Sequence, residues 1–490
     1  MKHFLDIARG AYAHLPAQTR TNIAWALRFV PEDLKWGSSY REWRKLLADA
    51  RSDASFIRAH QNRARVAIVT TAARKSPYYR ALLENVFGAD FDPAHLLDER
   101  HWHRIPVLNA PTVVEHARDM CTRPPSELDV SSSGGTSGKP VEFYLDRHRS
   151  PIEYAFVHDT WARAGFRPGD PRCVFRGVNI GTVGQTMRYD PALAELRCSV
   201  FHLGDDAMRG YHDAIVARGI RFIHGYPSAI AIFAAFLLRA GLAPLSQIAG
   251  VFPTSERLSD NHRAIASLAF GQAKIVPFYG LSEKAAFASA GPEDFDRYEF
   301  EPLYGYTELL DDNGEPVTTK GENGRIVSTG LLFPGMPFLR YDTGDRAELV
   351  ALPIAGNGYR LSVSALSPKH GIEYLLGRSG HLVPIKGLIG NVEGTTSGAR
   401  EYQFYQDTPG EVAVRIVPLE RAGTDFGAYQ DLLNHKMAGE LQVRVEIVDA
   451  IATTPRGKRK FIDQRLDLSQ ALRPHQVRET KSDLLREGTR

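Results

Sequence analysis

The sequence predicts an α/β protein: a large N-terminal domain with mostly parallel sheets flanked by helices, plus a small α+β C-terminal domain. Three observations predict it. Short apolar runs of strand length alternate with helix-like segments after residue 171, and a strand, strand, helix, strand order follows residue 377. The third is size, because 490 residues with 43% apolar side chains can bury a large core and favour two or more domains.

The large domain begins with a helical, charged segment, residues 1–100, for which Trp36, Trp43 and Trp102 are the expected anchors. Its main part is residues 101–377. The expected strands there are residues 171–177, 195–203, 220–224, 248–252 and 274–278. The expected helices are residues 207–218, 227–240 and 260–270. This β-α alternation predicts a largely parallel sheet with helices on its faces.

The small domain, residues 378–490, shows a different order of elements. Strands are expected at residues 401–405, 411–417 and 443–448, and a helix at residues 426–441. The segment around residues 377–394 is rich in glycine and weak in periodicity, which marks it as the junction.

The composition excludes several classes of protein. Sixty basic and 57 acidic side chains give a net charge of only +3, too little to imply a nucleic-acid partner. The three cysteines have no Cys-x-x-Cys spacing, so neither a disulfide framework nor a structural zinc site is expected. Residues 1–20 resemble no signal peptide, and the longest apolar stretch, residues 228–238, is about half a membrane span. We therefore expect a cytoplasmic protein without membrane insertion.

Glycine and polar residues follow the ends of the expected strands. In parallel sheets, ligands bind outside the carboxyl ends of the strands. Here those ends lead into residues 177–179, 225–228, 254–256 and 279–283. A binding site is expected at this edge of the sheet.

Residues 131–140 read SSSGGTSGKP and form a glycine-rich segment. Glycines let backbone N–H groups approach an anion, hydroxyls add donors, and Lys139 adds positive charge. The composition suits phosphate binding. The spacing is not that of a Walker loop, because three residues separate Gly134 from Gly138 and Pro140 follows the lysine. A flexible serine-glycine linker is the alternative interpretation.

Three motifs in order resemble the adenylate-forming superfamily of acyl-CoA synthetases, adenylation domains and luciferases. They are residues 132–140, YGLSE at 279–283 and YDTGD at 341–345. Residues 377–379 resemble the family's hinge motif, and residues 454–458 its terminal lysine loop. SPYY at 76–79 and RIPV at 104–107 look most like the phenylacetate-CoA ligase branch and its capsule-biosynthesis relatives.

The resemblance implies ATP-dependent activation of a small carboxylic acid, an aryl acid being favoured, as an acyl-AMP. Pyrophosphate is released, and the acyl group then forms a thioester with coenzyme A. One alternative is transfer of the acyl group to a carrier protein, an amine or a sugar in polysaccharide or secondary-metabolite biosynthesis. Another is a non-catalytic binding protein of the same fold. Family analogy also suggests a homodimer.

The resemblance also assigns roles to individual residues. Tyr279 is implied to stack on adenine, Asp345 to accept hydrogen bonds from the ribose, and Glu283 to bind Mg²⁺. Arg378 would contact ribose or phosphate, and Lys458 would bridge the carboxylate and the α-phosphate during catalysis. The implied nucleotide-binding set is Ser132, Ser133, Gly134, Gly135, Thr136, Ser137, Gly138, Lys139, Ser255, Glu256, Tyr279, Gly280, Ser282 and Asp345.

Each of these residues also has a plainer interpretation. Tyr279 fits a core tyrosine, Asp345 a turn aspartate, Glu283 an exposed acid at a helix N-terminus, and Lys458 a solvated charge run. Gly380 stands where family members commonly carry an acidic residue or lysine after the hinge arginine. Glycine still permits the large backbone change that a hinge requires.

The pocket for the acid is expected along residues 179–186 and 224–232. Asn179, His224, Tyr226 and Ser228 are its candidate substrate-binding residues. Neither segment contains an arginine or lysine that marks a second charge on the substrate. His224 fits equally well a strand-end histidine whose hydrogen bonds are satisfied within the protein.

Overall fold

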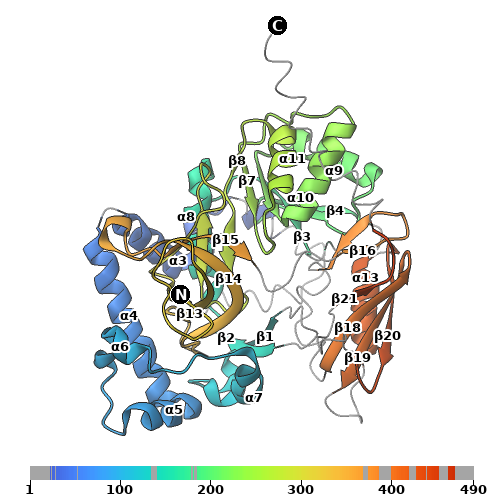
Figure 1. Ribbon diagram of the computed structural model, residues 1–490. Helices are drawn as coiled ribbons and strands as arrows, with labels where there is room; N and C mark the ends of the chain where they lie inside the picture. The colour runs from blue at the N-terminus through green and yellow to red at the C-terminus, as the bar shows by residue number, and fades with distance from the viewer. Residues whose placement is uncertain are drawn as a thin grey trace.

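The computed structural model describes residues 23, 25–27, 29–51, 53–133, 141–177, 180, 185–367, 374–385, 399–418, 426–437, 439–451 and 462–468. Figure 1 shows three regions: N-terminal helices on one side, a small sheet on the opposite side, and the larger sheets with their helices between them. No helix in these residues is long and apolar enough to cross a membrane.

The N-terminal region is helical, as the sequence predicted. Asp53 accepts from Phe56 N and caps one helix, and Ser76 accepts from Tyr79 N and caps the next. Trp36 and Trp102 are buried, whereas Trp43 is half-buried. The elements are α3 (Glu32–Ala50), α4 (Ala54–Lys75), α5 (Pro77–Phe87), η1 (Pro93–Leu97), α6 (Glu99–Trp102), α7 (Ala110–Met120) and η2 (Pro125–Glu127).

A six-stranded sheet forms the centre of the large domain, in the order β4-β5-β3-β6-β7-β8. All neighbours pair parallel except β4 and β5, so the predicted parallel sheet is confirmed. Its strands are β3 (Arg172–Arg176), β4 (Met187–Asp190), β5 (Glu195–Ser199), β6 (Phe222–Gly225), β7 (Gly250–Pro253) and β8 (Lys274–Ile275). The predicted strand at 274–278 is shorter than expected because Pro277 cannot donate to a ladder.

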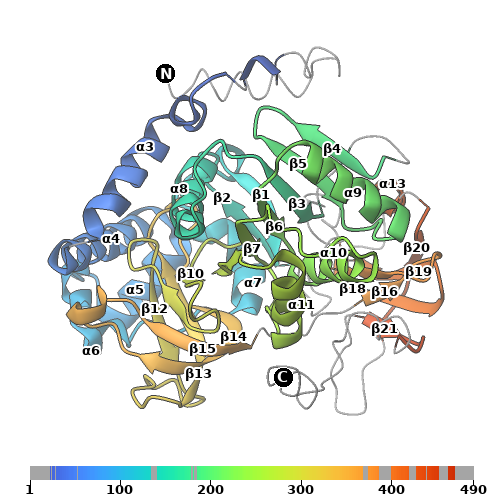
Figure 2. The same ribbon diagram turned by 90° about the horizontal axis from the view of Figure 1, so that it is seen from above.

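Helices cover both faces of this sheet (Figure 2). On one face, Phe175 and Cys173 pack in a core with α9 (Asp205–Ala217), α10 (Pro227–Arg239) and α11 (Asp260–Phe270). On the other face, Phe222 and Phe252 pack with α8 (Arg149–Trp161), which η3 (Ala162–Ala164) follows. Cys173 and Cys198 are both free thiols.

A second sheet has seven strands in the order β12-β13-β14-β15-β11-β10-β9, and every pair in it is antiparallel. No sequence pattern predicted this sheet. Its elements are β9 (Phe278–Gly280), β10 (Phe287–Ala290), β11 (Tyr298–Phe300), β12 (Gly305–Leu310), β13 (Asn323–Gly330), β14 (Tyr341–Ala351), η4 (Ala355–Asn357) and β15 (Ser362–Ser367).

The C-terminal region contains a four-stranded sheet in the order β20-β19-β18-β21 and a two-stranded hairpin. The elements are β16 (Tyr374–Leu376), β17 (Leu382–Pro384), β18 (Ala399–Thr408), β19 (Glu411–Pro418), α13 (Gly427–Met437), β20 (Gln442–Ile447) and β21 (Ile462–Gln464). The predicted strand, strand, helix, strand order is confirmed. The helix predicted at 426–441 ends at Met437, because Gly439 has a φ of 89° and terminates it. The domain boundary predicted after residue 377 falls in the turn between β16 and β17 and stays a prediction.

One apolar core runs through both the six-stranded sheet and the C-terminal region. Leu375 and Leu382 of the hairpin belong to the same cluster as Phe175 and Phe233 of the large domain. His381 also lies against the large domain, since a Cβ on Gly204 would be 3.0 Å from His381 Nε2. The hairpin therefore packs directly on the large domain.

Candidate functional site

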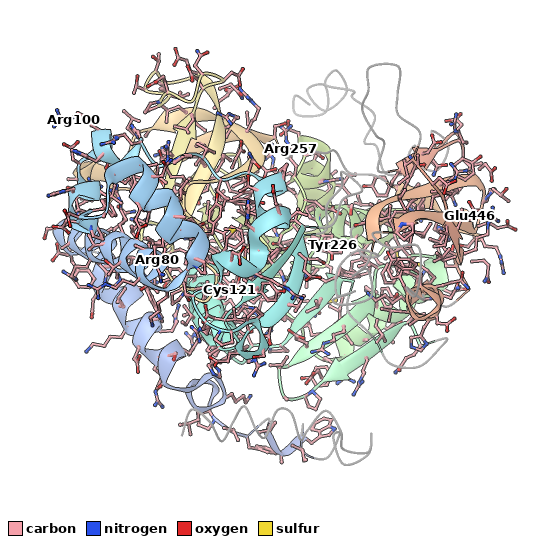
Figure 3. The ribbon with its side chains drawn as sticks, turned by 90° about the horizontal axis from the view of Figure 1, so that it is seen from below. Arg80, Arg100, Cys121, Tyr226, Arg257 and Glu446 are labelled. Atoms are coloured by element: carbon pink, nitrogen blue, oxygen red, sulfur yellow. The ribbon has the colours of Figure 1, made fainter. Side chains whose placement is uncertain are left out.

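The ends of β6 and β7 meet β9 at the carboxyl edge of the six-stranded sheet. Gly225 ends β6 where a Cβ would clash with Phe175 O, and Tyr226 N donates to the same carbonyl over 2.9 Å. An isolated parallel bridge joins Thr254 to Phe278. Figure 3 shows Tyr226 and Arg257 near the middle of the molecule, between the N-terminal helices and the small sheet. The strand ends that the sequence predicted to meet are neighbours.

Glu256 and Ser228 come together at the N-terminus of α10. Ser228 N donates to Glu256 Oε2 over 3.1 Å, so the carboxylate occupies the favourable end of the helix dipole. Tyr374 of the hairpin lies near this carboxylate: burial raises the pKa of the Tyr374 hydroxyl, and the charge of Glu256 raises it further. The C-terminal hairpin thus approaches the same edge.

His224 is a buried strand-end histidine. Its Nδ1 lies 2.9 Å from Phe252 O, a distance at which an Nδ1–H donates to the carbonyl. Burial lowers the pKa of the imidazole well below its usual value, and the charge of Arg176 lowers it further. The ring is therefore neutral at pH 7. The hydrogen bond of Nδ1 is satisfied within the protein, as the alternative interpretation of His224 expected.

Tyr279 and Asp345 are direct partners, although 66 residues separate them in sequence. The tyrosine hydroxyl donates to Asp345 Oδ2 over 2.8 Å. The ring packs edge-on against Phe300 at 5.8 Å and is 9% exposed. Next to it, a Cβ on Gly280 would have no atom within 4 Å. Tyr279 is thus a largely buried residue beside open space, with its hydroxyl oriented by the predicted ribose-binding acid.

Glu283 is buried beside Tyr341, whose hydroxyl donates to Glu283 Oε1 over 2.8 Å. Burial raises the pKa of the Glu283 carboxyl, and the nearby charge of Asp345 adds to this, while the Tyr341 hydroxyl opposes it. The interpretation of Glu283 as an exposed helix-terminal acid is wrong, because the side chain is 8% exposed and no helix begins at this residue. The structure therefore gathers Tyr279, Glu283 and Asp345, together with Tyr341, into one cluster.

Two residues beside this cluster have left-handed backbone conformations that side chains rarely adopt. Ser255 has a φ of 68° and Lys284 a φ of 61°. Lys284 Nζ donates to Glu153 Oε1 on α8 over 2.6 Å, which fixes the turn that carries Glu283. Ser255 and Ser282 are both exposed at this edge.

The glycine-rich segment connects two paired strands. β1 (Asp129–Ser133) and β2 (Val141–Leu145) are antiparallel, with Ser132 opposite Glu142 and Ser133 opposite Val141. Ser132 is half-buried at the end of this hairpin. The candidates Gly134, Gly135, Thr136, Ser137, Gly138 and Lys139 lie outside the described residues.

Arg378 lies in the turn of the β16–β17 hairpin. Its side chain is exposed, its N donates to Glu440 O over 2.9 Å, and its Cβ and Cα lie against Gly410. Gly380 in the same turn has a φ of 81°. The structure thus places Arg378 with the small sheet. Asn179 and Lys458 lie outside the described residues.

Tyr341 is the residue that the sequence analysis quoted but did not interpret. It opens the YDTGD motif, and its pairing with Glu283 depends on the position of β14 beside the turn after β9. The available signal was its place in the motif, since the same motif supplied Asp345. Lys284 follows Glu283 directly and could have been found in the same way.

Comparisons with known proteins identify the fold. The structure is similar to 2-hydroxyisobutyryl-CoA ligase solved in complex with 2-HIB-AMP and CoA, with a TM-score of 0.52 and 18% identity over 86% of this chain and 92% of that one. A postadenylation-state structure of the same ligase in complex with R3-HIB-AMP gives a TM-score of 0.50 and 17% identity, with the same coverage of both chains. The chain therefore has the fold of adenylate-forming enzymes, and the resemblance that its motifs predicted is confirmed at that level.

The chain is also similar to the protein CapK of Staphylococcus aureus. The two are 22% identical over 403 residues, which is 79% of this chain and 85% of the relative. No family model matches the sequence.

Proposed function

We propose that this protein is an ATP-dependent adenylate-forming ligase. It activates a small carboxylic acid, with aryl acids favoured, as an acyl-AMP and then forms a thioester with coenzyme A. The observation that carries the proposal is the cluster at the sheet edge, where Tyr279 and Asp345 are hydrogen-bonded and Glu283 lies buried beside them. Three residues implied by two separate motifs meet in a fold that adenylate-forming enzymes share.

The cluster has the chemistry to hold a nucleotide and a magnesium ion. The carboxylate of Asp345 has a second oxygen to offer to ribose hydroxyls, and Gly280 leaves space beside Tyr279. Glu283 and Asp345 are close enough that each raises the cost of charge on the other, which a divalent cation would relieve. No group of three or more metal-ligating side chains occurs among the described residues. One or two carboxylates plus phosphates is the usual environment of Mg²⁺, so the residues fit the ion.

The reaction requires two anions to meet. A carboxylate oxygen of the acid attacks the α-phosphorus of ATP, forming one O–P bond as the bond to the bridging oxygen breaks and pyrophosphate leaves. Mg²⁺, when bound, neutralises phosphate charge. The chain's part is to position the reactants and stabilise charge: Asp345 and Tyr279 fix the nucleoside, the hydroxyls of residues 131–137 offer donors to phosphates, and Lys458 offers a cation to the reacting oxygens.

The second step transfers the acyl group. The thiol of coenzyme A attacks the acyl carbonyl, a C–S bond forms, AMP leaves with the electron pair of the C–O bond, and the thiol proton passes to solvent. A cytoplasmic location and a homodimer belong to the same proposal.

The alternative acceptor is a carrier protein, an amine or a sugar. The similarity to CapK keeps this alternative beside the first, because that relative is not named as a CoA ligase. Gly380 also stands where family members commonly carry an acidic residue or lysine. AMP release that depends on CoA would support the first version, and acyl-AMP that accumulates in the presence of CoA would support the second.

The test is pyrophosphate exchange into ATP across aryl, fatty, hydroxy and amino acids. We expect exchange with one class of acid and a loss of roughly 10²- to 10³-fold in Lys458→Ala, the usual effect of removing one transition-state donor. Lys460→Ala is the matched control, because it removes the same charge two residues away. Equal losses in both variants would deny Lys458 its role, and no exchange with any acid, despite ATP binding, would overturn the proposed function.

A further inference from the structure

Arg176 lies at the edge that carries the candidate site and belongs to neither predicted pocket segment. It is the last residue of β3, a central strand of the six-stranded sheet, and its side chain is half-buried. Along the same strand, Arg172 and Arg176 are four residues apart and so point to the same face, the one that α8 covers.

The two arginines differ in their partners. Arg172 Nη2 donates to Glu195 Oε1 over 2.6 Å. The guanidinium of Arg176 has no hydrogen bond or ion pair with any residue that the structure describes. The acids on the neighbouring elements already have other partners: Glu195 pairs with Arg172 and Arg197, and Glu153 pairs with Lys284.

Two aromatic side chains lie near Arg176. Its charge acts on His224 and Tyr154, of which the first is kept neutral mainly by burial and the second by the usual high pKa of a phenol. Half-burying a cation without a partner costs free energy. A bound anion would recover that cost, and a guanidinium matches the two oxygens of a carboxylate.

Arg176 lies on the side of the site where the carboxylic acid substrate is proposed to bind. Strand order runs from β3 through β6 to β7, and the Thr254–Phe278 bridge leads on to β9 with Tyr279. Three strand spacings put Arg176 about 14 Å from the nucleoside-binding end. His224 in β6 and Tyr226 just after it, both predicted to contact the acid, lie between the two ends.

We propose that Arg176 binds a second carboxylate at the far end of the substrate, so that the preferred substrates are dicarboxylic acids. This rests on the proposed function and narrows its substrate class. Arg176 escaped the sequence analysis because it precedes the glycine that was taken as the start of the loop.

The experiment compares matched pairs of acids: 4-carboxyphenylacetate against 4-methylphenylacetate, and glutarate against pentanoate. We expect the protein to prefer the diacid of a pair by roughly tenfold or more in pyrophosphate exchange, as one charge-assisted interaction allows. Arg176→Met should abolish the preference by losing activity with the diacid alone, and Arg176→Lys should retain part of it. Arg188→Met, an exposed arginine on β4, is the matched control and should leave the preference unchanged.

A binding measurement keeps this test separate from the proposed function. Thermal-shift titrations of the same acids with AMP present need no catalysis, and the diacid should bind roughly tenfold more tightly to the native chain than to Arg176→Met. If exchange fails with every acid but this difference holds, the proposed function falls and the role of Arg176 stands. If the native chain and Arg176→Met share the same preference in both assays, or the variant loses all acids equally with a raised KM for ATP, the inference is overturned.

Discussion

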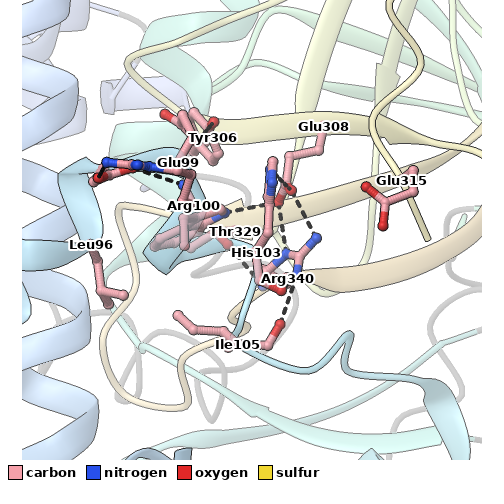
Figure 4. Close-up of polar contacts among 12 residues, drawn as sticks. Leu96, Glu99, Arg100, His103, Ile105, Tyr306, Glu308, Glu315, Thr329 and Arg340 are labelled. Atoms are coloured by element: carbon pink, nitrogen blue, oxygen red, sulfur yellow. Dashed lines mark hydrogen bonds and ion pairs between the residues drawn. The ribbon is translucent and has the colours of Figure 1, made fainter. Parts of the chain in front are cut away.

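Two buried glutamates in this molecule have opposite environments. Glu308 and Glu283 are each 8% exposed. Glu308 receives Arg340 Nη2 at 3.0 Å, Arg340 Nε at 3.2 Å and Trp102 Nε1 at 3.0 Å (Figure 4). Burial raises the pKa of the Glu308 carboxyl, but the hydrogen bond from His103 and the charge of Arg340 outweigh it, so the pKa is lowered.

Among the residues that the structure describes, no cation forms an ion pair with Glu283. Its side-chain hydrogen-bond partner is a neutral hydroxyl, that of Tyr341, and the charge with the largest effect on its pKa is that of Asp345, which repels it. The net result is a raised pKa. Lys284 also acts on Glu283, but its ammonium is held by Glu153.

The comparison separates a carboxylate that holds the fold from one to which the proposed function assigns a ligand. Arg340 also donates to Ile105 O over 2.6 Å and to His103 O over 2.9 Å, so the Glu308 cluster joins the N-terminal helices to the seven-stranded sheet. The Glu283 cluster joins β9 and the turn that follows it to β14. A buried acid without a cation is a cost to folding, and that cost is the physical sign of a function.

The largest effect is expected from Arg340→Leu. It leaves Glu308 buried without its cation and should lower the free energy of unfolding by about 3–5 kcal/mol. Thermal or urea unfolding followed by circular dichroism measures it, and Arg188→Leu serves as the exposed control. Pyrophosphate exchange per folded molecule should be unchanged. If the variant were as stable as the control, the ion pair between Glu308 and Arg340 would not stabilise the fold.

Glu283→Gln should show the opposite pattern. We expect pyrophosphate exchange to fall by roughly 10²- to 10³-fold, because the proposed carboxylate ligand of Mg²⁺ is lost. Stability should be equal or higher, because an uncompensated buried acid becomes a neutral amide. The exposed Glu322→Gln is the control. If the stability of Glu283→Gln fell as much as that of Arg340→Leu, Glu283 would stabilise the fold as Glu308 does.

Tyr341→Phe and Tyr279→Phe sharpen the comparison within the cluster. Removing the hydroxyl that orients Glu283 should lower kcat by roughly tenfold, the value of one hydrogen bond to a charged group. Removing the hydroxyl that orients Asp345 should instead raise the KM for ATP by roughly fivefold. Steady-state exchange at varied ATP separates the two effects. If both variants changed kcat and KM in the same way, Tyr341 would have no separate effect on catalysis and Tyr279 none on ATP binding.

The smallest effect concerns pH. Burial lowers the pKa of His262 to about 4, and His158 and His224 are lowered in the same way. A histidine depressed in the folded state binds its proton first in the unfolded chain, so its contribution is complete above about pH 6.5 and is lost as the pH falls towards 4. His262→Gln should make the loss of stability over that interval shallower by about 1–2 kcal/mol. Unfolding midpoints from pH 7 to pH 4 test this, with the exposed His95→Gln as control, and parallel curves would contradict it.

Local patterns predicted the parallel half of the fold well. The helix expected at 260–270 is α11. In the small C-terminal sheet, the strand expected at 411–417 is β19, one residue longer. The seven-stranded sheet could not be predicted in the same way. Its strands place polar residues such as Ser328 and Thr329 in buried positions, where hydrogen bonds to other elements replace apolar packing. Those partners are distant in sequence, so no short window contains the signal.

The site was predictable as a set of motifs but not as a network. Glu283 and Asp345 were found from their motifs, and the structure places them together. That Tyr341 orients one and Tyr279 the other depends on how β9 and β14 lie in space. Whether an arginine has a partner, as Arg172 does, also depends on a neighbouring strand, here β5. Tertiary pairing of this kind has no local sequence signature.

The apolar core shared by the β16–β17 hairpin and the six-stranded sheet has a thermodynamic consequence. Any rotation of the C-terminal region away from this arrangement would return Leu375 and Leu382 to water. A ligand can drive such a change only by binding the rotated form more tightly, by at least the free energy of the contacts that are lost. If the proposed acyl transfer requires this rotation, the hairpin contacts set the lowest binding free energy with which an acceptor could react.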